Sequence, residues 1–257
     1  MTDTHAHLDF LEEAELEEAK AHFPELRAIL TLGVDPSRWE RTIALAQGNV
    51  YAAVGLHPTS AHLLSPEVEE ALRHYARHPR VRAIGESGLD YHWTPETKPA
   101  QLKALDFQAS LAQELGLPLV LHVRGKDGKA EEDLAAWLLA HRPPQVVLHA
   151  FGGHPVLEAA GLQVGAYFSF AGPLTYRKNQ ALREAAQRLP LDHLLVETDT
   201  PFLPPEPHRG KRNLPHRVRH TLEKLAEVRG LPFGEMEAIT DANAERCFRF
   251  AGRVGSP

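Results

Sequence analysis

Short apolar runs alternate with longer amphipathic segments along most of this chain. The runs predict eight strands, at residues 2–8, 27–34, 50–57, 81–86, 117–123, 145–150, 166–171 and 194–199. The segments between them predict helices at residues 12–22, 36–47, 66–77, 98–115, 128–141, 155–161 and 176–189, and two further helices, 213–229 and 234–249, follow the last strand. The pattern is therefore a strand–helix repeat from one end of the chain to the other.

Strand–helix alternation is typical of parallel strands joined by right-handed crossovers. Eight such units within 257 residues favour closure into a barrel over an open sheet. Proline and glycine fall between the predicted elements, and no linker separates two halves of the chain. We expect the α/β class, with residues 1–257 forming a single (β/α)8 TIM-barrel domain.

Composition narrows the class of protein without choosing a function. The 43% hydrophobic content suits a full core, and the net charge of −6 excludes a global basic surface for tight non-specific nucleic-acid binding. A single cysteine rules out an intrachain disulfide and fits a reducing, cytoplasmic location. We see no signal peptide, and no apolar run long enough to span a bilayer, so no membrane partner is expected. Nothing in the chain indicates an obligate protein partner.

Histidines and carboxylates repeatedly follow the apolar runs. The candidates are His5, His7, Glu86, His122, His149 and Asp199, which belong to five separate predicted strands. The carboxyl ends of parallel barrel strands surround one rim, where active sites of this fold lie. We therefore expect these residues, distant in sequence, to converge in space.

Six ligands of mixed nitrogen and oxygen type exceed what one tetrahedral metal site uses. They suit two divalent ions with Glu86 as a bridging carboxylate, a pair that could activate water and stabilise a phosphoryl transfer. We predict Asp199 as both ligand and general base, with Glu197 behind it. The alternative for these two carboxylates is a structural ion pair.

Several other residues are predicted to serve the substrate. His57, in Gly55-Leu56-His57-Pro58, is expected to contact a phosphate or the leaving oxygen, although it could be a simple turn residue. Arg124 carries a planar fork that suits phosphate, and its alternative is a surface salt bridge. The segment 208–219 carries five Lys or Arg residues and no acid, so Arg212 and Asn213 within it are predicted substrate contacts.

Three aromatic residues also follow strand ends. They are Tyr91, Trp93 and Phe151, which could stack nucleic-acid bases, although core packing explains aromatic side chains more often.

Taken together, these motifs resemble those of the TatD-family metal-dependent deoxyribonucleases, within the amidohydrolase-like barrel superfamily. The resemblance covers essentially the whole chain and rests on residues 5–9, 55–58, 85–90, 121–124, 148–151, 197–201, 211–215 and 243–246. It implies a 3′-to-5′ exonuclease or related phosphodiesterase that needs Mg²⁺ or Mn²⁺, with Zn²⁺ also possible, and it implies the same six ligands. Ser87, Ala150 and Gly152 depart from the family's usual pattern close to those ligands.

Three functions compete at this point. The first is nuclease action on DNA ends, which the basic segment after the last strand favours. The second is hydrolysis of a small amide, lactone or phosphate ester, which the net charge favours and which the same barrel can support. The third is a metal-stabilised binding protein without turnover, which the presence of both Glu86 and Asp199 argues against.

Overall fold

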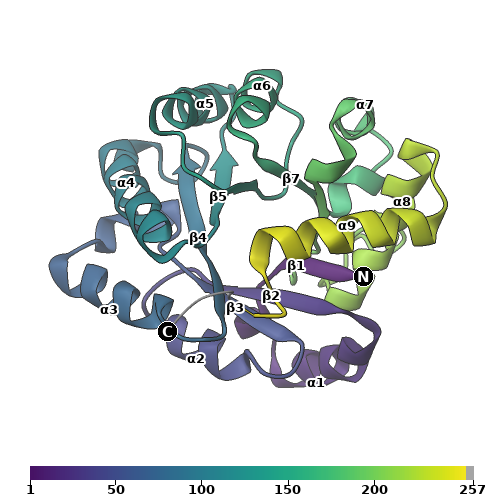
Figure 1. The fold of residues 1–257 in the computed structure, drawn as a ribbon, viewed down its shortest axis with the longest axis horizontal. Coiled ribbons are helices and arrows are strands. Elements are labelled where there is room, and N and C mark those ends of the chain that lie inside the picture. Colours follow the sequence, from purple (N-terminus) through teal and green to yellow (C-terminus); the bar gives the residue numbers. More distant parts are fainter. Residues whose placement is uncertain (253–257) are drawn as a thin grey trace.

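Eight parallel strands form a closed barrel in the computed structural model, which describes residues 1–252 (Figure 1). The strands are β1 (Thr2–Ala6), β2 (Ala28–Gly33), β3 (Val50–Val54), β4 (Val81–Asp90), β5 (Leu119–Arg124), β6 (Val146–Leu148), β7 (Tyr167–Phe170) and β8 (Leu194–Val196). Each strand pairs with the next one in chain order. The predicted barrel is confirmed, and residues 253–257 of the predicted domain lie outside the described residues.

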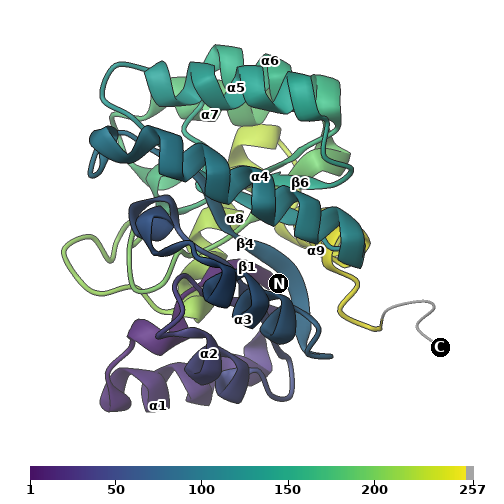
Figure 2. The same ribbon diagram turned by 90° about the vertical axis from the view of Figure 1, so that its left-hand side faces the viewer.

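Helices surround the barrel (Figure 2). They are α1 (Glu13–His22), α2 (Trp39–Leu45), α3 (Pro66–Ala76), α4 (Lys98–Leu115), α5 (Lys129–His141), α6 (Pro155–Val164), α7 (Gln180–Arg188), α8 (Val218–Arg229) and α9 (Phe233–Phe248). Short 3₁₀ turns are η1 (Leu8–Phe10), η2 (Phe23–Glu25), η3 (Pro58–Leu63), η4 (Pro95–Thr97), η5 (Gly172–Thr175), η6 (Leu191–His193) and η7 (Pro215–Arg217). Within residues 1–252, no helix has the length and apolar content needed to cross a membrane.

The barrel closes between β1 and the segment that follows β8. Ala6 and Thr200 form a parallel bridge. The His7 N–H donates to the Thr200 carbonyl over 2.7 Å, and the Asp199 N–H donates to the His5 carbonyl over 2.8 Å. The backbone of three candidate ligands therefore makes the seam of the barrel.

Alternate residues of each strand face opposite sides of the sheet. In β5, Leu119 and Leu121 pack in the large outer core with the surrounding helices, whereas Val120 belongs to a separate inner cluster. That inner cluster also includes Val147, Leu195 and residues of α9 such as Phe248. The inward-facing positions of the strands are thus filled by apolar side chains at one end of the barrel.

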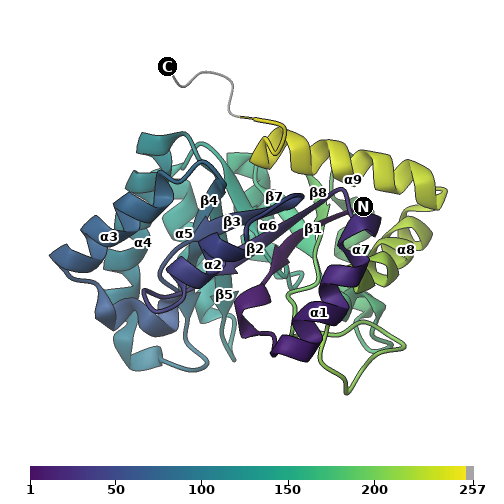
Figure 3. The ribbon, with the colours of Figure 1, turned by 90° about the horizontal axis from the view of Figure 1, so that it is seen from below.

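Helix α9 covers that end. In Figure 3 it lies across one end of the barrel, while the long loop after β8 projects from the other. The Met1 ammonium at the start of β1 pairs with Glu237 at 2.6 Å and with Asp241 at 3.2 Å, both on α9. The amino-terminal end of the barrel is therefore closed, and the carboxyl-terminal rim is left for chemistry.

Some predicted element bounds were wrong. β4 was predicted to end at Glu86 but continues to Asp90, because residues 87–90 pair in register with residues 121–124 of β5. The helix predicted at 213–229 begins as α8 only at Val218, after the 3₁₀ turn at Pro215, and the helix predicted at 176–189 begins as α7 only at Gln180.

Candidate metal centre and active site

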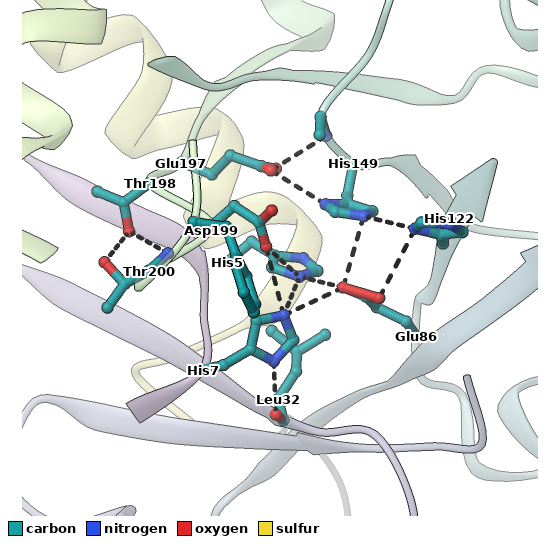
Figure 4. Close-up of polar contacts among 12 residues, drawn as sticks. His5, His7, Leu32, Glu86, His122, His149, Glu197, Thr198, Asp199 and Thr200 are labelled. Carbon is teal, nitrogen blue, oxygen red and sulfur yellow. Dashed lines mark hydrogen bonds and ion pairs between the residues drawn. The ribbon is translucent and has the colours of Figure 1, made fainter. Parts of the chain in front are cut away.

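Four of the predicted ligands converge at the seam of the barrel. His5 Nε2 lies 2.5 Å from Glu86 Oε1 and 3.2 Å from His7 Nε2. Asp199 Oδ1 lies 3.3 Å from His7 Nε2 and 3.6 Å from His5 Nε2. One ligand atom from each of these four residues falls within 4.8 Å of the others, which is the spacing of a shared coordination sphere (Figure 4).

A second group forms around the same glutamate. Glu86, His122 and His149 also offer ligand atoms within 4.8 Å of one another. His149 Nε2 lies 3.4 Å from Glu86 Oε1, and His122 Nδ1 lies 3.9 Å from Glu86 Oε2. Figure 4 shows the Glu86 carboxylate between the two sets of imidazoles. Its membership of both groups is what a bridging ligand requires.

Strand periodicity explains why these side chains point inward. His122 and His149 each come two residues after an inner-cluster residue, Val120 and Val147, so they continue the inward-facing column toward the rim. Glu86 sits where the β4–β5 register shifts between Ile84 and Ser87. A bulge of this kind re-aims a side chain.

Glycine permits the close strand approach at this bulge. A Cβ added to Gly88 would lie 1.9 Å from the His122 carbonyl oxygen, and Gly88 has a φ of +133° that side chains rarely adopt. Gly88 therefore lets β4 pack closely against the β5 backbone at His122.

Asp199 has an unusual backbone for its residue type. Its φ is +58°, in the left-handed region, and Ala150, directly after His149, has a φ of +42°. Aspartate tolerates this conformation better than most residues, while alanine does so at a cost of about 1 kcal/mol or more. Such strain at the ends of two strands, β6 and β8, is typical of residues held in place for function.

Three of the imidazoles have one nitrogen held by the protein and the other turned toward Glu86. His7 Nδ1 donates to the Leu32 carbonyl over 3.0 Å, His122 Nε2 lies 2.9 Å from Asp90 Oδ2, and His149 Nδ1 lies 3.0 Å from Glu197 Oε1. Metal-ligating histidines are usually oriented in this way. Glu197, predicted to stand behind Asp199, instead stands behind His149.

The charges of the cluster fit divalent cations. Burial opposes ionisation of Glu86, yet the nearby His149 and His5 hold the pKa of its carboxyl well below the usual range. Burial alone would lower the pKa of His149, but the charges of Glu86 and Glu197 raise it to about 9. The field that favours a proton on His149 equally favours a metal ion in its place, so both the donor set and the charge suit two divalent metals.

His57 lies beside the cluster in a neutral state. Its Nε2 is 3.3 Å from Glu86 Oε2, and burial together with His122 lowers its pKa to about 3. The Thr59 N–H donates to His57 Nδ1, so the ring proton is on Nε2 and faces the cluster. His57 can therefore donate a hydrogen bond to an oxyanion there.

A cavity of about 1070 Å³ opens above the cluster. Its floor includes Glu86 and Asp199, and its walls include Arg124, Lys178 and Trp93. A volume of this size is ample for a drug-sized ligand. Two cationic side chains at the walls suit an anionic one.

Residues 2–249 match the family described as TatD related DNase. The chain belongs to the TatD family. It is also 35% identical over 254 residues to the protein named Uncharacterized metal-dependent hydrolase YabD of Bacillus subtilis, covering 96% of this chain and 98% of that one. The family assignment and the cluster together identify the chain as a TatD-family metal-dependent hydrolase.

Two further TatD-family relatives match nearly as widely. The crystal structure of YJJV, a TatD homologue from Escherichia coli, superposes with a TM-score of 0.86 at 31% identity, covering 97% of this chain and 98% of that one. The protein of Pectobacterium parmentieri named 3′-5′ ssDNA/RNA exonuclease TatD is 34% identical over 231 residues, covering 87% of this chain and 88% of its own.

Two of the predicted substrate contacts in this TatD-family protein lie elsewhere. Asn213 is fully buried, and its amide donates to the carbonyls of Thr198 and Phe202. Arg212 pairs with Glu15 over 2.6 Å instead of facing the cavity. Asn213 thus holds the loop after β8, and Arg212 ties that loop to α1. Neither residue lines the cavity: the Asn213 amide is hydrogen-bonded to backbone carbonyls, and the Arg212 guanidinium is paired with Glu15.

Sequence reasoning also missed residues of the cavity. Lys178 and Asn179, before α7, line it, and so do Phe10 and Phe202. Phe202 could have been found, because it follows Asp199 closely in the chain. Lys178 carries no comparable signal, since it lies well beyond the end of β7.

Proposed function

We propose that this TatD-family hydrolase is a divalent-metal-dependent 3′-to-5′ exonuclease that hydrolyses phosphodiesters at unpaired DNA ends. The observation that carries the proposal is the pair of ligand groups sharing Glu86 at the floor of a cavity walled by Arg124 and Lys178. Two adjacent divalent ions suit in-line displacement at phosphorus, and cations beside them suit the flanking phosphates. The name of the Pectobacterium relative, 3′-5′ ssDNA/RNA exonuclease TatD, supports the same reaction and polarity.

The side chains divide the work of that reaction. Bound as a pair, Mg²⁺ or Mn²⁺ (Zn²⁺ as an alternative) would supply Lewis acidity for the attacking water and neutralise phosphate charge. Asp199 borders the cavity and can take the proton of the attacking water. His57 donates from Nε2 to a phosphate or leaving oxygen. Arg124 and Lys178 neutralise the neighbouring phosphates.

Digestion of end-labelled oligonucleotides tests this proposal. The purified protein, reconstituted with Mg²⁺ or Mn²⁺, should shorten 5′-labelled single-stranded DNA one nucleotide at a time. It should contain close to two metal equivalents, and EDTA should abolish digestion until metal is restored. A 3′-blocked oligonucleotide is the matched control and should persist. Full activity in excess EDTA, or rapid turnover of lactones or small esters without release of nucleotides, would refute the nuclease proposal.

A further inference from the structure

Trp93 is exposed at the wall of the active-site cavity. Its side chain is 64% exposed, while Trp39 and Trp137 are 0% and 6% exposed. It lines the cavity, and the Arg124 guanidinium lies 5.6 Å from its ring centroid. An exposed aromatic ring beside a cation offers a face on which a planar ligand can stack.

Asp90 fixes the position of Trp93 relative to the metal ligands. Asp90 Oδ1 accepts the backbone N–H of Trp93 over 2.8 Å, and Asp90 Oδ2 lies 2.9 Å from His122 Nε2. Gln101 in turn donates to the Asp90 carbonyl and accepts its N–H. One buried carboxylate therefore holds both a candidate ligand and the turn that carries the ring.

A second exposed ring stands across the barrel. Phe202 is 48% exposed and lines the same cavity, with Phe10 at its edge at 5.9 Å between centroids. Its N–H donates to the Asp199 carbonyl over 2.7 Å, so its position is fixed to another candidate ligand. Trp93 follows β4 and Phe202 follows β8, which are opposite strands in an eight-stranded barrel.

We infer that Trp93 and Phe202 are nucleobase-stacking platforms, which hold the unpaired bases on either side of the hydrolysed phosphate. The inference rests on the proposed function and specifies its substrate as single-stranded nucleic acid of at least two nucleotides. Aromatic faces bind every base, so the site selects unpaired bases and not a sequence. Arg124 has two roles in this arrangement, because its guanidinium lies over the Trp93 ring and also lines the cavity in which the neighbouring phosphate would bind.

Binding of base-bearing and abasic oligonucleotides tests this inference. The probes are two phosphorothioate-linked tetranucleotides of equal charge, one with bases and one abasic, titrated into the metal-loaded protein. The base-bearing tetramer should quench tryptophan fluorescence, because Trp93 is far more exposed than Trp39 or Trp137. It should bind at least about fivefold more tightly than the abasic one, the fold-change expected for one stacked base.

Substitutions separate stacking from a structural role. Trp93→Ala and Phe202→Ala should each weaken the base-bearing tetramer at least about fivefold and leave the abasic tetramer unchanged, while Trp93→Phe should restore most of the binding. Leu162→Ala is the matched control, since Leu162 is 43% exposed on α6 and is not part of the described cavity lining.

The two proposals fail in different ways. Equal affinity for both tetramers, or an equal loss of both in Trp93→Ala, would overturn the stacking role while digestion of DNA continued. Base-dependent binding without digestion would support the platforms and contradict the nuclease.

Discussion

Two pairs of imidazoles within the described residues have ring centroids 3.9 Å apart, and only one of these pairs lies in the candidate metal centre. His5 and His149 stack at the rim with ring centroids 3.9 Å apart. His22 and His216 form a half-buried surface pair, also with centroids 3.9 Å apart. The spacing of the rings therefore does not distinguish a ligand cluster from a surface contact.

Buried carboxylates make the difference between the two pairs. Glu86 and Glu197 raise the pKa of His149 to about 9 against the effect of burial. Burial and His22 lower the pKa of His216 to about 4. Two buried carboxylates act on the rim pair, whereas the surface pair has a single exposed carboxylate, Glu25, on the His22 side. A metal site is thus recognised by the acids that surround its imidazoles and not by the imidazoles alone.

Removing the shared carboxylate should have the largest effect. Glu86→Ala takes a ligand from both groups at once, so metal content should fall from near two equivalents and turnover should fall to the level of the chelated protein. Elemental analysis and end-labelled digestion measure the two quantities. His216→Ala, at the surface pair, should keep both. If Glu86→Ala kept two equivalents of bound metal, Glu86 would not be the bridging ligand.

Asp199→Asn should lower kcat by roughly 10²-fold or more, because asparagine keeps the shape and one oxygen but cannot accept the water proton. Metal content should be at least partly retained and the circular dichroism spectrum unchanged. Steady-state kinetics with a labelled oligonucleotide give the value. A wild-type kcat with metal bound would move the role of base to another group, with His57 the nearest alternative.

Glu197→Gln should weaken metal binding by about 10- to 100-fold, the usual cost of losing a carboxylate behind a ligating histidine. Glu197 Oε1 accepts from His149 Nδ1, and glutamine cannot supply its negative charge. Chelator competition measures the affinity. Glu25→Gln is the matched control, because Glu25 holds His22 in the same way at 2.6 Å, and it should change nothing.

Arg124→Ala should reduce the salt dependence of DNA binding by about one phosphate contact. Arg212→Ala should leave that slope unchanged, since its guanidinium pairs with Glu15, although the sequence predicted a substrate contact for both arginines. Fluorescence anisotropy over a series of salt concentrations compares the two variants. A weaker salt dependence of DNA binding in Arg212→Ala would instead indicate that the basic segment 208–219 contacts the substrate.

The smallest effect concerns His216 and pH. Its pKa is about 4 in the folded protein against an ordinary value of 6.5, so the unfolded chain binds the extra proton first as pH falls. Stability should therefore drop between about pH 7 and pH 4, by at most about 3 kcal/mol from this group. His216→Gln should lack that component. Urea unfolding of the chelated wild-type and His216→Gln proteins at pH 7.5 and pH 4.5 measures this difference. An equal loss in the free energy of unfolding in both proteins would contradict the role of His216.

Periodicity was enough to predict most of this fold. Eight apolar runs gave eight strands because barrel strands are buried on both faces, and the convergence of residues at their ends followed from barrel geometry. The bounds that failed depend on tertiary pairing: β4 runs on past Glu86 because β5 offers partners for residues 87–90.

The metal ligands were easier to predict from sequence than the residues that line the substrate cavity. Six polar residues that break apolar runs stand out in the sequence, and each would be costly to bury without a partner. Arg212 and Asn213 looked like substrate contacts because they follow β8, but a loop can turn back. The Asn213 amide instead donates hydrogen bonds to backbone carbonyls within its own loop. Lys178 reaches the cavity only through the course of the loop before α7.

The seam of the barrel has a consequence for how the protein is made. His5 and His7 leave the ribosome well before Asp199 and Thr200, the residues after β8 with which their backbones form hydrogen bonds. During synthesis, β1 therefore carries two of the candidate ligands before the segment after β8, its partner at the barrel seam, has been made. Closure of the barrel and completion of the ligand set are then one event. A metal ion that binds only the completed ligand set stabilises the closed barrel against unfolding, by a free energy that rises with the metal concentration.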